Sequence, residues 1–178
     1  MTNEAQSLGP KQTATILRGI LRQQFPATKF SVVTERGSMM SSVRVSWTDG
    51  PTASLVKAIT NRFEAGHFDG MTDSYDYAPN ADRALLIDGK VYVAGTRYVS
   101  EERKISAKFA NKCIAKVAAY WGRVVEVPTA VEGYFGFDLE PKGIGRKPVR
   151  DGLDIHDDWH SSIYRAASDA TEYAQSAK

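Results

Sequence analysis

The chain has 178 residues, of which 42% are hydrophobic and 25% charged, as expected for a globular domain with one core and an appended segment. The formal net charge of +2 is too small to indicate a nucleic-acid partner by itself. The single cysteine, Cys113, excludes an internal disulfide and a cysteine-rich zinc site, and no apolar run is long enough to span a membrane.

Residues 1–10 are predicted to be disordered, and their polar composition lacks the apolar core of a secretory signal. We therefore expect a cytoplasmic protein. A helix is predicted from Lys11 to Gln24, because apolar residues recur there at helical spacing. The next two segments, Lys29–Thr34 and Ser42–Thr48, alternate apolar with polar residues and predict a β-hairpin with one buried face.

A second helix is predicted after the turn Asp49–Thr52, with Gly66 ending it as a left-handed C′ residue. The segment from His67 to Asn80 then reads as a compact loop that interleaves aromatic and acidic side chains. A second hairpin is predicted from Ala84–Asp88 and Val91–Ser100, with Asp88-Gly89 at its turn.

The C-terminal part contains two further predicted helices. Ser100 is expected to cap a helix that ends at Gly122, and the buried side of this helix includes Cys113, predicted to be inert. Residues 124–152 read as a long irregular connector. The last helix is predicted at about Asp154 to Ala174, with a narrow, alanine-rich apolar side.

These elements predict an α+β fold, with an antiparallel sheet formed by two β-hairpins, helices packed on one face, and a C-terminal helix. The domain is expected to span residues 11–123. Residues 124–178 are expected to be an extension that contains the long loop and the amphipathic helix.

A protein-binding surface is predicted at the aromatic and acidic residues of the His67–Asn80 loop, and at Trp47 and Asp49, which come earlier in the chain. Surfaces that mix aromatic side chains with carboxylates suit protein recognition. The candidates are Trp47, Asp49, Phe68, Asp69, Asp73, Tyr75, Asp76 and Tyr77. One alternative is a turn shaped by aspartates. Another is cation binding or acid–base chemistry by Asp69, Asp73 and Asp76, and a hydrolase would use Asp69, Asp73 and His67.

Nucleic-acid binding is the second hypothesis, and it depends on two groups of basic residues that could follow phosphates. The candidates are Lys104, Lys108, Lys112, Lys116, Lys142, Arg146, Lys147 and Arg150. The four lysines of the first group are spaced by four residues along the helix predicted from Ser100. The alternatives are an ordinary solvated helix face and neutralisation of the second group by the aspartates that follow it.

Signals for catalysis or a bound ion are weak. His156 and His160 would share one helix face, but no third ligand is marked nearby. The chain lacks a nucleophile elbow, a P-loop and a dinucleotide-binding glycine motif. The sequence therefore predicts no catalytic residue, no metal site and no cofactor.

Three segments carry a resemblance to a known family. Lys29–Val32, Val45–Thr52 and Phe68–Tyr77 resemble the large polyvalent protein-associated domain family, twenty-ninth class, and the resemblance covers about Gln12 to Gly122. It implies a protein of a phage or conjugative element that acts in the cytoplasm of a bacterial host. It also implies a counter-defence role, such as non-catalytic inhibition of a CRISPR or restriction nucleoprotein. Direct nucleic-acid binding and a small hydrolase that uses the acidic loop remain the alternatives.

Overall fold

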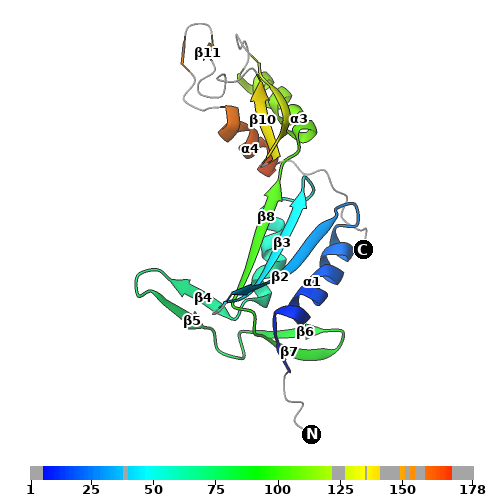
Figure 1. Cartoon of the computed structure of the whole chain (residues 1–178), viewed down its shortest axis with the longest axis vertical. Coiled ribbons are helices and arrows are strands. Elements are labelled where there is room, and N and C mark those ends of the chain that lie inside the picture. The colour runs from blue at the N-terminus through cyan, green and yellow to red at the C-terminus, as the bar shows by residue number, and fades with distance from the viewer. Residues whose placement is uncertain are drawn as a thin grey trace. The chain divides into compact units, whose positions relative to one another are not determined.

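The computed structural model describes residues 6–37, 40–121, 127–134, 136–140, 149–150, 153–154 and 159–169. These residues form two compact units (Figure 1). The first unit runs up to Trp47 and again from Ala53 to Glu102, and the second contains Thr48–Thr52 and the described residues from Arg103 onward.

The first unit is built on a three-stranded sheet with the order β2-β3-β8. Its strands are β2 (Phe30–Gly37), β3 (Met40–Thr48) and β8 (Tyr98–Lys104). Strands β2 and β3 are antiparallel, and Phe30 pairs with Trp47 at one end of the ladder. Val32, Val43 and Val45 are buried, so the alternation that predicted this hairpin and its inward face is confirmed.

Two helices accompany this sheet. Helix α1 (Pro10–Gln24) begins one residue before the predicted start, ends at the predicted residue, and buries Leu17 and Leu21. Helix α2 (Ala53–Thr60) continues into a 3₁₀ turn, η1 (Asn61–Phe63). The hydroxyl of Thr96 donates to that of Thr13 at 2.8 Å, so both polar groups are satisfied inside the core.

A second sheet has the order β1-β7-β6 and contains β1 (Gln6–Leu8), β6 (Ala84–Ile87) and β7 (Lys90–Ala94). The predicted turn is confirmed, with φ of 48° at Asp88 and 75° at Gly89. Two expectations are wrong in detail. The predicted strand Val91–Ser100 is divided between β7, which pairs with β6, and β8, which lies in the sheet of the first hairpin. Gln6–Leu8, expected to be disordered, pairs in parallel with β7. The α+β class itself is confirmed.

The segment predicted as a loop after Gly66 is a separate two-stranded hairpin, β4 (Gly66–Asp69) and β5 (Ser74–Tyr77). In Figure 1 it extends away from the sheet of the first unit. Gly66 begins β4 and does not have a positive φ, so its predicted role as a left-handed C′ residue is wrong. The glycine instead permits close approach, because an added Cβ would overlap the carbonyl oxygen of Asp76.

The helix predicted to begin at Ser100 begins later. Strand β8 continues to Lys104, and helix α3 (Ala107–Trp121) follows it. Alternate residues of the strand find partners: Glu101 accepts a hydrogen bond from the Thr60 hydroxyl, and Arg103 donates to the Asp49 carbonyl oxygen at 2.7 Å. The cap of α3 is Ser106, whose Oγ accepts from the Phe109 N–H at 3.2 Å.

The second unit contains α3, the hairpin β9 (Thr129–Gly133) and β10 (Gly136–Glu140), and helix α4 (Trp159–Asp169). Two short strands, β11 (Val149–Arg150) and β12 (Leu153–Asp154), pair with each other. The buried residues that join the helices to the hairpin are Phe109, Cys113, Ile114, Val117, Ala130, Phe137, Leu139, Trp159, Ile163 and Ala167. Helix α3 therefore packs with elements that the sequence had assigned to an extension. The buried position of Cys113 and the apolar side of the last helix are confirmed.

No helix in the part of the chain that the structure describes combines the length and apolar character needed to cross a membrane.

Candidate protein-binding surface

Most of the predicted protein-binding residues lie on the hairpin β4–β5, but Trp47 and Asp49 do not. The Trp47 side chain is only 3% exposed and packs against Phe30, with ring centroids 5.5 Å apart. Its alternation with Val43 and Val45 puts it on the buried face of β3. Trp47 is therefore a core residue, and its expected place on a binding surface is corrected.

Asp49 lies in the second unit, where it contacts Arg103 and Ser106; we call these three residues the joint. Its Oδ1 accepts from the Ser106 N–H at 2.8 Å, and its Oδ2 accepts from the Ser106 hydroxyl at 2.7 Å. Arg103 donates to the backbone carbonyls of Asp49 and Gly50, at 2.7 and 3.1 Å. Asp49 also has a φ of 57°, a conformation that aspartate tolerates better than most residues. The structure thus places Asp49 at the start of α3 and away from the hairpin, and its expected role in partner binding stays a prediction.

The hairpin β4–β5 separates its side chains into two faces. Phe68 pairs with Tyr75 and Gly66 pairs with Tyr77, so Phe68, Tyr75 and Tyr77 share one face. We call these three residues the aromatic face. The next positions pair His67 with Asp76 and Asp69 with Ser74, which makes the opposite face polar and acidic. Because side chains alternate along each strand, the residues that were predicted to form one mixed loop lie on two different faces of the hairpin.

Two aspartates of the hairpin build its turn. Asp69 accepts hydrogen bonds from the Met71 N–H at 2.9 Å and from the Thr72 hydroxyl at 3.0 Å. These bonds favour the charged carboxylate and hold the pKa of Asp69 below its usual value. Asp73 occupies a left-handed position with a φ of 52°. Asp69 and Asp73 thus support the turn, and the Asp69 carboxylate stays charged at neutral pH.

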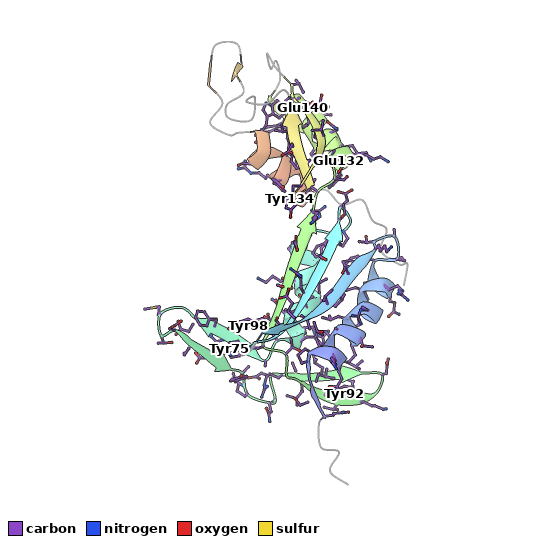
Figure 2. The ribbon with its side chains drawn as sticks, viewed as in Figure 1. Tyr75, Tyr92, Tyr98, Glu132, Tyr134 and Glu140 are labelled. Atoms are coloured by element: carbon purple, nitrogen blue, oxygen red, sulfur yellow. The ribbon has the colours of Figure 1, made fainter. Side chains whose placement is uncertain are left out.

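Tyr75 fixes the aromatic face to the first unit. Its hydroxyl donates to the Arg97 carbonyl oxygen at 2.6 Å, and the Arg97 guanidinium lies over its ring, 4.6 Å from the centroid. The ring of Tyr98 meets it edge-on at 5.2 Å, and Figure 2 shows these two tyrosines next to each other. Burial, with the nearby Glu64 carboxylate, raises the pKa of Tyr75 to about 12. Tyr75 therefore stays a neutral hydrogen-bond donor.

The other apolar side chains of the hairpin point into solvent. Phe68 is 50% exposed, Tyr77 is 63% exposed, and Met71 at the tip of the turn is 96% exposed. Tyr77 packs edge-on against Tyr75, with centroids 4.8 Å apart, so it extends an anchored aromatic group. Large apolar side chains gathered on an exposed element are typical of protein-binding sites.

The base of the hairpin is held by backbone bonds. The Ala65 N–H donates to the Thr96 carbonyl at 2.8 Å, and the Ala78 N–H donates to the Ala65 carbonyl at 3.0 Å. Beside them, the Glu64 carboxylate accepts from the Val99 N–H at 2.8 Å. Burial is the main cause that raises the pKa of Glu64, and the Glu101 carboxylate also raises it. The base of the hairpin is therefore fixed to the rest of the first unit.

The predicted row of lysines is shorter than expected. Lys104 is the last residue of β8, whereas Lys108, Lys112 and Lys116 are exposed on α3 at a spacing of one helical turn. Of the second basic group, Lys142, Arg146 and Lys147 lie outside the described residues, and Arg150 is described only as part of β11.

The sequence offered three histidines as candidates for metal binding or catalysis. His67 lies on the polar face of the hairpin, opposite Asp76. His156 is outside the described residues, and His160 is described only as part of α4. Among the described residues, no group of three His, Cys, Asp or Glu side chains is arranged to hold a metal ion.

Arg97 and Tyr98 were missed by sequence reasoning, although they anchor the aromatic face. Tyr98 carried a weak signal, because an aromatic residue within an alternating strand is often a cross-strand partner. Arg97 carried none. Its contact with Tyr75 joins residues that are far apart in the sequence.

Comparison with known proteins gives one result. A family model described as large polyvalent protein associated domain 29 matches residues 8–106. A search of the curated proteins and a search of the solved structures found no match.

Proposed function

The chain belongs to the family of large polyvalent protein associated domain 29, and from this premise we propose that it is a counter-defence protein that binds a host nucleoprotein through the hairpin β4–β5. The family consists of domains from polyvalent proteins of phages and other mobile elements. The proposed partner is a CRISPR or restriction effector, and the proposed inhibition is non-catalytic.

The aromatic face carries this proposal. Phe68 and Tyr77 are at least half exposed on an element whose base is fixed by Tyr75 and by backbone bonds. A rigid exposed aromatic group loses little conformational entropy on binding and can fill a pocket of a partner. Residues of this kind supply most of the binding free energy in many protein interfaces.

The polar face of the same hairpin supports a nucleoprotein partner. Asp69 and Asp76 lie on this face, and hydrogen bonds from the turn keep Asp69 charged. Proteins that bind nucleic acid present basic surfaces to the phosphates. An acidic hairpin face would be complementary to such a surface, while the aromatic face supplies the apolar contacts.

Protection of incoming DNA in defined hosts tests the proposal. Strains that each carry one CRISPR or restriction system are challenged with phage or plasmid DNA, with and without the full chain. We expect rescue in at least one system. We also expect co-elution of the chain with the purified effector after nuclease treatment. Absence of rescue across the panel, or a complex that nuclease destroys, would contradict the proposal.

The double substitution Phe68→Ala and Tyr77→Ser is expected to weaken effector binding by more than about 30-fold, because truncating one hot-spot side chain costs about 2 kcal/mol. The unfolding midpoint should change little, since both side chains are at least half exposed. Binding is measured by titration of the labelled chain with purified effector. Tyr120→Ser is the matched control, because Tyr120 is 87% exposed in the second unit. Equal affinities for both variants would exclude the aromatic face.

Direct nucleic-acid binding is a second candidate, supported by the three exposed lysines of α3. Lys108, Lys112 and Lys116 lie along one side of the helix, while Phe109, Cys113 and Val117 pack in the core. A row of cations at this spacing can contact consecutive phosphates.

The double substitution Lys108→Glu and Lys112→Glu tests the second candidate. If both lysines contact phosphate, the slope of log K against log salt for single-stranded DNA should fall in magnitude by about 1.4. Fluorescence anisotropy over a salt series measures it. Lys11→Glu with Lys29→Glu makes the same charge change at exposed sites of the first unit and should leave the slope unchanged. Identical slopes for both double variants would remove the lysine row from consideration.

A further inference from the structure

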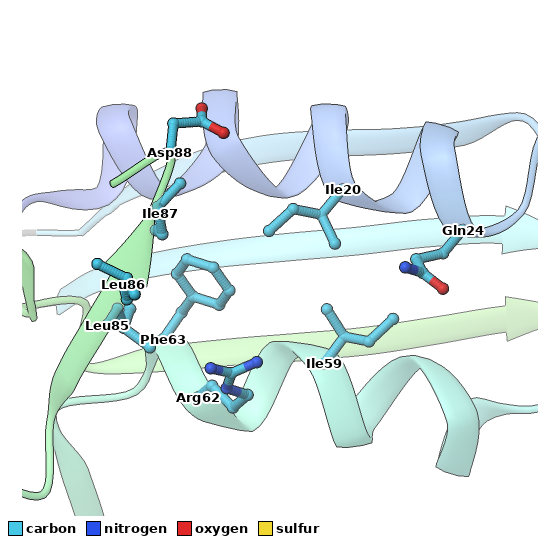
Figure 3. A pocket seen from close by; sticks show the side chains of 9 residues that line it. All are labelled: Ile20, Gln24, Ile59, Arg62, Phe63, Leu85, Leu86, Ile87 and Asp88. Carbon is cyan, nitrogen blue, oxygen red and sulfur yellow. The ribbon is translucent and has the colours of Figure 1, made fainter. Parts of the chain in front are cut away.

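A groove of about 420 Å³ lies in the first unit, between α1 on one side and α2 with η1 on the other, and is closed at one end by β6 (Figure 3). Phe63 and Leu85 are buried at its floor. Ile20 from α1 and Ile59 from α2 are half-buried on the two helices that flank it. The groove therefore has apolar side chains at its floor and flanks, and it is formed by α1, α2, η1 and β6 of one unit.

Both helices present ridges to the groove. Ile20 and Gln24 are four residues apart on α1, and Ile59 and Phe63 are four residues apart on α2 and η1. Rows of side chains at this spacing are the ridges that pack into the grooves of a neighbouring helix. Leu86, 71% exposed, adds an apolar side chain to the lining at the β6 end.

The rim carries charges of opposite sign. Figure 3 shows Arg62 on η1 and Asp88 across the groove, near α1. Both residues are exposed, and neither the guanidinium nor the carboxylate has a hydrogen bond or ion pair within the part of the chain that the structure describes. An occupant can therefore pair with both without displacing a contact among the described residues.

We propose that this groove is a second binding site, and that it holds an amphipathic helical segment of a protein partner. The segment would place aliphatic side chains between Ile20 and Ile59, an acidic residue near Arg62 and a basic residue near Asp88. A single-ended amphiphile such as a fatty acid would match only one of the two rim charges. The inference is independent of the hairpin β4–β5, which shares no residue with the groove.

Designed peptides test this site on the full chain. Four helical peptides share one face of leucines and differ only at their ends: acidic then basic, basic then acidic, both acidic, or both basic. Affinity is measured by fluorescence anisotropy, and the site by backbone amide shifts. We expect one mixed peptide to bind at least about fivefold tighter than the two same-charge peptides, since two rim ion pairs become favourable together.

Two charge variants of the chain locate the specificity. Arg62→Glu should make the doubly basic peptide the tightest ligand. Asp88→Asn should reduce the preference for a basic residue at that rim, and asparagine tolerates the positive φ of this turn position. Arg22→Glu, an exposed change on α1 outside the groove, is the matched control and should keep the wild-type order. Leu86→Ser should weaken all four peptides by about fivefold, as expected for loss of an apolar contact.

Four results would overturn the proposal. The first is equal affinity of the wild-type chain for all four peptides. The second is amide shifts that fall outside α1, α2, η1 and β6. The third is binding of decanoate without binding of any peptide, which would assign the groove to a single-ended amphiphile. Loss of peptide binding in the Phe68→Ala and Tyr77→Ser variant would also contradict it, because the groove would not then act independently.

Discussion

Replacing Gly66 with alanine is expected to disrupt the hairpin β4–β5 and abolish binding through its aromatic face. A Cβ at this position would overlap the Asp76 carbonyl oxygen and lie 2.8 Å from the carbonyl carbon. Both atoms belong to the backbone, so no side-chain rotation can relieve the overlap. We expect the free energy of unfolding of the first unit to fall by about 2 kcal/mol, within the usual cost of overpacking.

Gly70→Ala provides the matched control for this prediction, because an added Cβ at Gly70 has nothing within 4 Å. Urea unfolding gives the stability of both variants, and amide hydrogen exchange reports on the residues of β4 and β5. Faster exchange in the hairpin is expected for Gly66→Ala only. Similar exchange and similar unfolding curves for the two variants would show that the close approach is not required.

Replacing Arg103 with methionine is expected to cause the largest loss of stability in the second unit. Its guanidinium donates to three backbone carbonyls, those of Asp49, Gly50 and Ala167, at 2.7, 3.1 and 2.7 Å. Methionine keeps most of the apolar stem and leaves these oxygens without their donor. Since Arg103 is only half-buried, we expect a loss of about 3 kcal/mol, less than the sum of three charge-assisted bonds.

Hydrogen exchange resolves the effect of this substitution by unit. Peptides from α3 and α4 should lose protection, whereas peptides from α1 and β3 should keep theirs. Lys104→Met, at the neighbouring exposed position of β8, is the matched control and should leave both units unchanged. If α3 and α4 are equally protected from hydrogen exchange in the Arg103→Met and Lys104→Met variants, water replaces the guanidinium with little loss of stability.

Local patterns predicted the elements whose structure depends on near neighbours. Alternation in Ser42–Thr48 predicted the strand and its buried face. Trp47 lies on that face, although it had been expected on a binding surface. The dipeptide Asp88-Gly89 predicted a tight turn, because a two-residue hairpin of this kind needs positive φ at both positions. Helix α1 was predicted from its apolar stripe.

Contacts between distant residues decided the elements that were predicted wrongly. Ser100, Glu101 and Glu102 have the composition of a capped helix start, but Glu101 bonds to Thr60 and Arg103 to Asp49 only when this segment is extended. Gly66 was interpreted as a helix stop, although its function is to admit the backbone of Asp76. Neither partner can be identified from sequence spacing.

The residue types of the candidate site could be predicted from the sequence, but their positions in space could not. The aromatic and acidic residues of the hairpin stood out in the sequence, but their division into two faces depends on the register of β4 and β5. The groove between α1 and α2 gave no signal at all, because its residues come from four separate elements and from the turn after β6. Arg62 and Asp88 become a pair of rim charges only in the folded unit.

The joint formed by Asp49, Arg103 and Ser106 bears on how the chain can be divided. A fragment cut after Glu102 would keep the Asp49 carboxylate but lose the Ser106 N–H and hydroxyl that it binds. The family match extends to residue 106 and so contains the whole joint. The matched segment thus contains both sides of the contact at the start of α3, and a fusion made after Ser106 would retain the bonds between Asp49 and Ser106.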